Sequence, residues 1–419
     1  MVERSTMTAG SGRSRRWVGS RLCLTLLMGA AAALGACTRD VQDSPPSISG
    51  RLWRAKLNDT TLVVYLTEEA RSKAVRGVSD DASRHEPYTR YELVVRRMPD
   101  GSLAKSLTLG DIGRGPNTDD PLIIGVVGDV VWLWRNGLEA RSLSDLSTRA
   151  TLATLAGTGP ESASDILPRE SKGYAILAEP LALVARGRDA RFYAIDAAAG
   201  AVRQVDPSTF PPTTSSTRVE DRFDYLQAPG QSRPFTSPSN ILQRSFLTSD
   251  GKWYALLSES ERSEVSKWPS GESHPYGEVA RSAYRTTYKL DDRRQPEIDV
   301  AGLRALGSER LIQAGYLIRS AWSVWDVSDP SSSLVLAKNA LGSSEPWVVV
   351  RLARDGSVVW RTSTALTTPS ELIDLGGHIA FIGEEIRDGA TDRQRQRLVW
   401  VSERTGERHA LSIATGEVQ

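Results

Sequence analysis

Short apolar runs, each bounded by turn-forming residues, divide this chain along most of its length. Runs of roughly 4–8 residues rich in Val, Ile, Tyr and Trp are typical of β-strands, whereas a helix usually needs ~10 or more residues. Asp-Gly and Asn-Gly pairs supply the positive φ of tight hairpin turns. No long segment has a 3.6-residue apolar period, so the pattern predicts an all-β fold. The turn pairs are Asp100-Gly101, Asn136-Gly137, Asp250-Gly251 and Asp355-Gly356, and the predicted strands are 62–66, 91–95, 122–127, 130–134, 174–177, 181–185, 191–195, 253–257, 284–290, 347–352, 358–361, 379–382 and 398–401.

The strands also occur in a repeated phrase, in which an apolar strand, a polar turn and a second strand follow one another. The clearest copies cover 192–202, 349–360 and 398–408, and 132–140 is a looser copy. The phrase resembles the blade hairpins of β-propellers, especially the quinoprotein-like kind. Since one four-stranded blade cannot bury both of its faces, blades stack around a ring. At ~40–50 residues per blade, the chain after the leader could hold about seven to nine blades. The irregular polar insertions lower this number, so the resemblance implies a β-propeller of about six or seven four-stranded blades.

Polar stretches interrupt the predicted strands at 68–86, 207–240, 258–276 and 383–397. We interpret them as loops, either lining one mouth of the ring or serving as solvated connections. Residues 301–311 are the one segment that could form one or two helical turns.

The N-terminal segment has the three parts of a secretory signal peptide. Arginines precede an apolar stretch over 22–34, and the small residues Gly35 and Ala36 follow it. The apolar stretch is shorter than the ~20 residues of a membrane-spanning helix. We therefore expect export and cleavage, not a transmembrane anchor.

Leu34-Gly35-Ala36-Cys37 resembles the lipobox of bacterial lipoproteins. The resemblance implies cleavage between Ala36 and Cys37, acyl chains on Cys37, and a membrane as partner through that lipid. Thr38 implies transfer to the outer membrane, because Asp at that position favours inner-membrane retention in the family. The expected protein is exported and lipid-anchored to the cell envelope, on the outer membrane facing the periplasm. Its expected parts are a signal peptide (1–36), a lipidated cysteine with a flexible tether (37–49) and a β-propeller domain (50–419).

The charges and the cysteines exclude several classes of function. Lysine and arginine total 52, aspartate and glutamate total 51, and no basic stripe stands out, so nucleic acid is not an expected partner. Cys23 lies in the leader and Cys37 takes the lipid. The mature chain then has no thiol for a disulfide, a zinc-thiolate site or a cysteine nucleophile.

The four histidines His85, His274, His378 and His409 have no metal-pair spacing among them. We predict structural roles for them: His378 marks a turn before a strand, and His409 lies on a strand face. No metal site is predicted.

Known catalytic motifs are also missing or incomplete. No G-x-S-x-G motif occurs, and the S-x-x-K match at 102–105 follows a turn and lacks its companion motifs. The acidic pairs Asp119-Asp120 and Asp291-Asp292 lack calcium-loop spacing, and 113–116 lacks the Lys-Ser/Thr of a phosphate loop. No catalytic residue is therefore predicted.

Tryptophans at blade positions, such as Trp132, Trp134 and Trp400, are expected to pack between sheets. Quinone-dependent dehydrogenases of the similar fold use a vicinal disulfide, which the mature chain lacks, so no cofactor is expected. The blade resemblance extends to lipoproteins that assist outer-membrane β-barrel assembly, which implies an envelope protein as partner. We expect a binding or scaffolding module; the alternative is an envelope hydrolase or lyase acting on carbohydrate or peptide at the propeller mouth.

Overall fold

The computed structural model describes residues 40–76, 83–113, 120–157, 162–178, 181–206, 233–234, 242–248, 250–265, 280–292, 296–317, 332–342, 344–387 and 390–419. The expected signal peptide, which includes Ala36, and the expected lipidation site Cys37 lie outside these residues. Within these ranges, no helix has the length and apolar character needed to cross a membrane.

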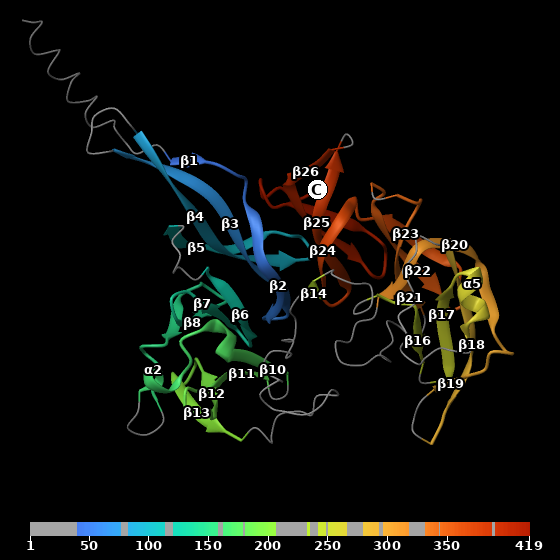
Figure 1. Ribbon diagram of the computed structural model, residues 1–419, viewed down its shortest axis with the longest axis horizontal. Coiled ribbons are helices and arrows are strands. Elements are labelled where there is room, and N and C mark those ends of the chain that lie inside the picture. Colours follow the sequence, from blue (N-terminus) through green and yellow to red (C-terminus); the bar gives the residue numbers. More distant parts are fainter. Residues whose placement is uncertain are drawn as a thin grey trace, which may run out of the picture.

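The described strands form five antiparallel sheets (Figure 1). We name them the N-terminal, second, third, double and C-terminal sheets. The N-terminal sheet holds β1 (Asp40–Gln42), β2 (Ser47–Leu57), β3 (Thr60–Arg76), β4 (Ser83–Met98) and β5 (Leu103–Gly113). The second sheet holds β6 (Leu122–Val127), β7 (Val130–Trp134), β8 (Leu138–Ser142) and β9 (Thr148–Thr151). The third sheet holds β10 (Tyr174–Ala178), β11 (Leu181–Arg186), β12 (Phe192–Asp196) and β13 (Ala201–Val205).

The double sheet contains two four-stranded units, because β20 pairs with β18 through its first part and with β21 through its last part. Its strands are β15 (Leu242–Gln243), β16 (Ser245–Leu247), β17 (Lys252–Leu257), β18 (Ala280–Leu290), β19 (Pro296–Ile298), β20 (Arg304–Leu317), β21 (Ser332–Lys338), β22 (Trp347–Ala353) and β23 (Val358–Ser363). The C-terminal sheet holds β14 (Arg233–Pro234), β24 (Leu366–Asp374), β25 (His378–Arg387), β26 (Ala390–Ser402) and β27 (Arg408–Ser412). The short described helices are α2 (Ala163–Ile166), η1 (Ser171–Gly173) and α5 (Glu259–Ser263).

Apolar clusters between the sheets fix the order in which the sheets pack. One cluster joins the third, second and N-terminal sheets, another joins the N-terminal to the C-terminal sheet, and a third joins the C-terminal to the double sheet. The sheets therefore follow one another along an arc, as Figure 1 shows. The fold is an all-β propeller, and its described strands make six four-stranded units.

The first and last sheets pack against each other, as expected for the two ends of a propeller chain. Ile48 and Leu411 share one apolar cluster, and the Ile48 amide donates a hydrogen bond to Gln396 Oε1 at 2.6 Å. Side chains, not a shared strand, make this junction, because β2 pairs with β3 and β27 pairs with β26.

Each predicted strand lies within an observed strand, except that the predicted strand 191–195 begins one residue before β12. The observed strands β3, β4, β18, β25 and β26 are longer than predicted. The three clearest copies of the repeated phrase form the hairpins β12–β13, β22–β23 and β26–β27. These hairpins are the third and fourth strands of their units, which are equivalent positions. The looser copy at 132–140 differs, because it joins the second and third strands, β7 and β8, of its sheet.

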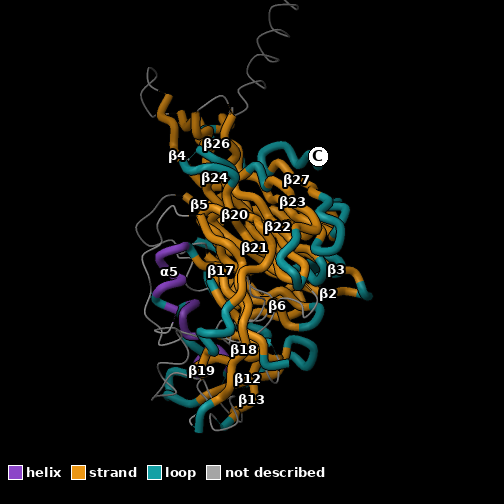
Figure 2. The backbone as a smooth tube through the Cα atoms, turned by 90° about the vertical axis from the view of Figure 1, so that its right-hand side faces the viewer, coloured by secondary structure: helices purple, strands orange, loops and turns teal. Residues whose placement is uncertain are grey.

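Two expectations from local pattern were wrong. Residues 304–311, expected within one or two helical turns, belong to β20, because pairing with β18 overrides the local preference. The stretches 68–86 and 383–397, expected as loops, lie largely in long extensions of β3–β4 and β25–β26. Hydrogen bonds between the paired strands satisfy the backbone N–H and C=O groups there, so these extensions form without an apolar face. Figure 2 shows both extensions at the same end of the molecule.

Candidate functional site

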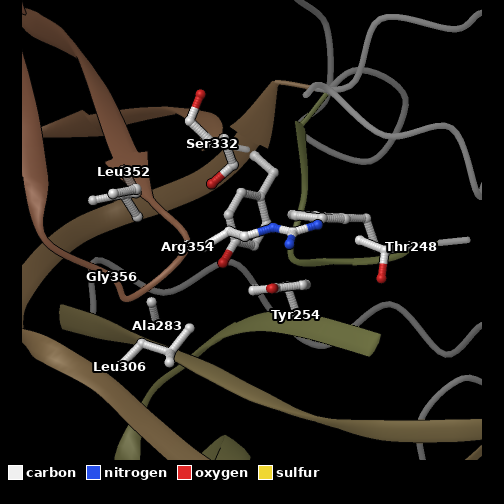
Figure 3. Close-up of a pocket in the computed structure, with 12 residues that line it drawn as sticks. Thr248, Tyr254, Ala283, Leu306, Ser332, Leu352, Arg354 and Gly356 are labelled. Carbon is white, nitrogen blue, oxygen red and sulfur yellow. The ribbon is translucent and has the colours of Figure 1, made fainter. Parts of the chain in front are cut away.

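A pocket opens between the two units of the double sheet, close to the turn that joins β22 and β23 (Figure 3). Its empty volume is about 320 Å³ when the open mouth is included. Six elements of the sheet contribute to it. The lining residues are Phe246, Thr248, Tyr254, Ala283, Leu306, Tyr316, Ser332, Ser333, Leu352, Ala353, Arg354 and Gly356.

Three aromatic rings form one wall of the pocket. Phe246 of β16 stacks on Tyr254 of β17, with ring centroids 5.1 Å apart and planes at 11°. Tyr316 of β20 meets Phe246 edge-on at 4.8 Å and 87°. Burial raises the pKa of Tyr316, and the negative charge that Tyr254 would carry when deprotonated raises it further. The wall is therefore apolar and uncharged.

The opposite rim depends on a close approach of two backbones. The turn after β22 is closed by a hydrogen bond from the Ala353 amide to the Ser357 carbonyl at 2.9 Å. Gly356 has φ of 82° in this turn, and a Cβ there would lie 2.5 Å from Leu306 Cβ. Only glycine fits this position, which holds the turn against β20.

Arg354 supplies the charge at the mouth, where its side chain extends toward Thr248 in Figure 3. Its NH2 lies 3.8 Å from Asp250 Oδ2, and both side chains are about half exposed, at 51% and 48%. A hydrogen bond from the Thr248 hydroxyl, and then the charge of Arg354, lower the pKa of Asp250. This weak surface pair can exchange for a carboxylate brought by a ligand.

The lining combines an aromatic wall, three hydroxyl side chains and one arginine. The hydroxyls of Ser332 and Ser333 belong to residues that are 8% exposed. Such a site suits an apolar group placed beside a hydrogen-bond acceptor or an anion. Because its empty volume includes the open mouth, the pocket is a depression that a partner side chain would contact from outside.

His85 lies in the N-terminal sheet, whereas His378 and His409 lie in the C-terminal sheet. His85 lies exposed on β4. His409 of β27 stacks on Trp400 at 5.5 Å and 22°, in agreement with the predicted strand-face position. Burial, and then the charge of His409, lower the pKa of His378 at the start of β25. His274 is outside the described residues, among which no group of His, Cys, Asp and Glu is arranged to hold a metal.

The remaining candidates have structural roles where they are described. Ser102 donates to Asp100 Oδ1 at 3.0 Å, and a strand, not a helix, follows it, which agrees with rejecting the S-x-x-K match. Asp120 accepts a hydrogen bond from the Tyr91 hydroxyl at 2.8 Å, while Asp119 is outside the described residues. Trp132 and Trp400 are buried between sheets, as expected.

Sequence reasoning missed both the pocket and a buried ionic cluster beside it. Glu261 of α5 accepts hydrogen bonds from Arg281 at 2.9 Å and forms an ion pair with Arg244. All three residues are at most 8% exposed. The S-x-x-E spacing of Ser258 and Glu261 is a capping-box signal that locates the helix, but no local signal marks the two arginines as its partners.

No family model matches the chain, and no curated protein matches it. Among solved structures, it is similar to the β-propeller domain of the trilobed protease from Pyrococcus furiosus, at 13% identity over 90% of this chain and 96% of that chain, with a TM-score of 0.22. It is also similar to the N-terminal domain of Nup159 (12% identity, 91% and 83% covered, TM-score 0.18). A third similar structure is Saccharomyces cerevisiae Sqt1 (9% identity, 88% and 86% covered, TM-score 0.18). TM-scores this low carry no argument, so the propeller class rests on the sheets of this chain.

Proposed function

We propose that this chain is an exported envelope lipoprotein, anchored through Cys37, whose propeller is a binding or scaffolding module for a protein partner. The observation that carries the binding role is the lining of the pocket in the double sheet. An aromatic wall, buried serine hydroxyls and Arg354 form a recognition surface. The alternative is an envelope hydrolase or lyase that acts on carbohydrate or peptide at the propeller mouth.

The partner segment is expected to present an apolar side chain next to a carboxylate. The apolar side chain would pack at the mouth of the pocket beside Tyr254 and Tyr316. Removal of these apolar surfaces from water would favour binding. The carboxylate would replace Asp250 at the Arg354 guanidinium, in a charge-assisted contact. Because the site offers both an aromatic wall and a guanidinium group, it would select ligands that carry both an apolar group and a carboxylate.

Selection of displayed peptides on the purified protein tests this binding role. We expect enriched peptides to carry an apolar residue beside Asp or Glu, and Arg354→Glu to weaken their binding by about tenfold or more, because like charges oppose each other at the mouth. The matched control is Arg361→Glu, since Arg361 lies on β23 outside the pocket and is 38% exposed. Equal binding by both variants would refute the site, and cleavage of the bound peptides would favour the alternative.

Replacing Cys37 with serine tests the anchor. We expect unprocessed precursor without lipid, because only a thiolate accepts the diacylglyceryl group. Mass spectrometry and membrane fractionation measure both effects, and Cys23→Ser, in the leader, serves as the control that keeps processing and lipid. Membrane fractionation that does not change in Cys37→Ser would contradict the lipoprotein assignment.

A further inference from the structure

β3 and β4 extend as an arm beyond the point where β2 leaves the N-terminal sheet. At its base β5 pairs with Tyr88–Arg90 of β4, and β1 pairs with Arg71–Lys73 of β3. β2 leaves β3 at the pair Ser47–Glu68, and β3 and β4 continue side by side to the pair Arg76–Ser83. The eight positions from Glu68 to Arg76 span about 25 Å at strand rise. We call residues 69–76 and 83–90 the arm; Figure 2 shows it projecting from one end of the molecule.

The segment that follows Cys37 is attached to this arm. β1 pairs antiparallel with β3, with Asp40 opposite Lys73 and Gln42 opposite Arg71. The Asp43 amide then donates to the Ala70 carbonyl at 3.0 Å, and Asp43 Oδ1 accepts from the Ser72 hydroxyl at 3.1 Å. The part of the expected tether from Asp40 to Ser44 is therefore bound along the edge of β3.

The direction of β1 leads the chain back from Gln42 to Asp40 toward the outer end of the arm. Because the pairing is antiparallel, the chain runs toward Arg76 as it is followed back from Gln42 to Asp40. Cys37 precedes Asp40 by three positions, which span at most about 10 Å. Arg76 lies three positions beyond Lys73 on β3, which is again about 10 Å at strand rise. A lipid on Cys37 is therefore attached within about 10 Å of Asp40, a reach that matches the distance from Lys73, the partner of Asp40, to the end of the arm.

We propose that the arm is the membrane-contacting surface of this protein. Its outer end would hold β2 about 25 Å, and the end of β5 opposite Tyr88 about 16 Å, from the lipid headgroups. The partner is the bilayer into which the Cys37 lipid inserts, so the inference rests on the proposed anchoring. β1 acts as a strap that fixes the lipid to the arm and so sets the orientation of the body. The far end, where β18 and β19 lie in both views, then faces away from the membrane (Figures 1 and 2).

Energy transfer from single labelled positions tests this orientation, because the mature chain has no free thiol. Lys73→Cys places a donor dye at an exposed arm position, and Leu290→Cys places it at a far position that is 55% exposed. The lipidated protein is reconstituted in phosphatidylethanolamine–phosphatidylglycerol vesicles with an acceptor dye on the headgroups. We expect at least about twofold more transfer from position 73 than from position 290. Equal transfer would overturn the proposal.

Releasing the strap provides a second, independent test. Asp43→Pro removes the Asp43 amide from the Ala70 carbonyl, which then keeps only the longer bond from the Ser44 amide at 3.3 Å. Release of the strap would leave up to ten positions between Cys37 and Ser47, or about 33 Å of chain. We expect transfer from position 73 to fall toward the value at position 290, whereas Asp43→Asn, which keeps the amide and an acceptor oxygen, retains it. No change in Asp43→Pro would refute the strap. Protein that does not float with the vesicles would instead show that the anchor itself had failed.

Discussion

Replacing Trp400 with alanine is expected to lower the free energy of unfolding by about 3–5 kcal/mol, the range for truncating a large buried aromatic side chain. Trp400 is fully buried in the cluster that joins the N-terminal and C-terminal sheets. Its Nε1 donates a hydrogen bond to the Pro99 carbonyl at 2.7 Å. Denaturation by urea, followed by circular dichroism, measures the loss.

Two further variants separate the contributions of Trp400. Trp400→Phe keeps most of the buried ring but loses the donor to Pro99, so we expect a loss of about 1–3 kcal/mol. Gly101 has φ of 68°, and a Cβ there would lie 2.6 Å from the Trp400 ring; Gly101→Ala should therefore also destabilise the junction. An unfolding free energy for Trp400→Ala within about 1 kcal/mol of the parent would refute the role of this junction.

The sequence predicted most of the strands because their apolar residues are contiguous. Strands such as Val130–Trp134 (β7) are buried along their whole length, and an uninterrupted run of Val, Leu and Trp is sufficient to locate them. β21 escaped prediction although all seven of its residues are buried, because it begins with two serines and ends with Lys338. The Lys338 amine reaches the Gly342 carbonyl at 2.8 Å, a contact that no local pattern reveals.

The sequence did not predict the arm or the pocket, for a related physical reason. The strand extension over Glu68–Arg76 is stabilised by backbone pairing and by surface contacts such as that from Arg71 to Glu69 at 2.7 Å, so its composition is that of a polar loop. The pocket combines Phe246, Tyr316 and Arg354, which are far apart in the sequence and meet only when two units of one sheet fold together. Its chemistry exists only in the tertiary structure.

Replacing Glu261 with glutamine is expected to cost about 3–5 kcal/mol, because the change leaves Arg244 and Arg281 buried without a counter-charge. Glu261 Oε2 also accepts the Ser258 amide at 2.8 Å, which ties α5 to β17. Glu259→Gln is the matched control, since Glu259 is an exposed residue of the same helix. We expect the control to change the unfolding free energy by less than about 0.5 kcal/mol. Similar losses in the two variants would show that the buried cluster has no special role.

The same cluster predicts how stability depends on pH. Burial would raise the pKa of Glu261, but the hydrogen bonds from Arg281 and the Ser258 amide, with the charges of Arg281 and Arg244, lower it from 4.5 to about 2. A carboxyl whose pKa is lower in the folded state stabilises the fold above its unfolded pKa. This contribution, about 3 kcal/mol, is lost as the pH falls from 4.5 toward 2. Since protonated Glu261 resembles glutamine, the unfolding free energies of the parent and Glu261→Gln should converge over this range when measured by urea titration. A difference between them that stays constant down to pH 2 would mean that Glu261 does not bind the two arginines as a carboxylate.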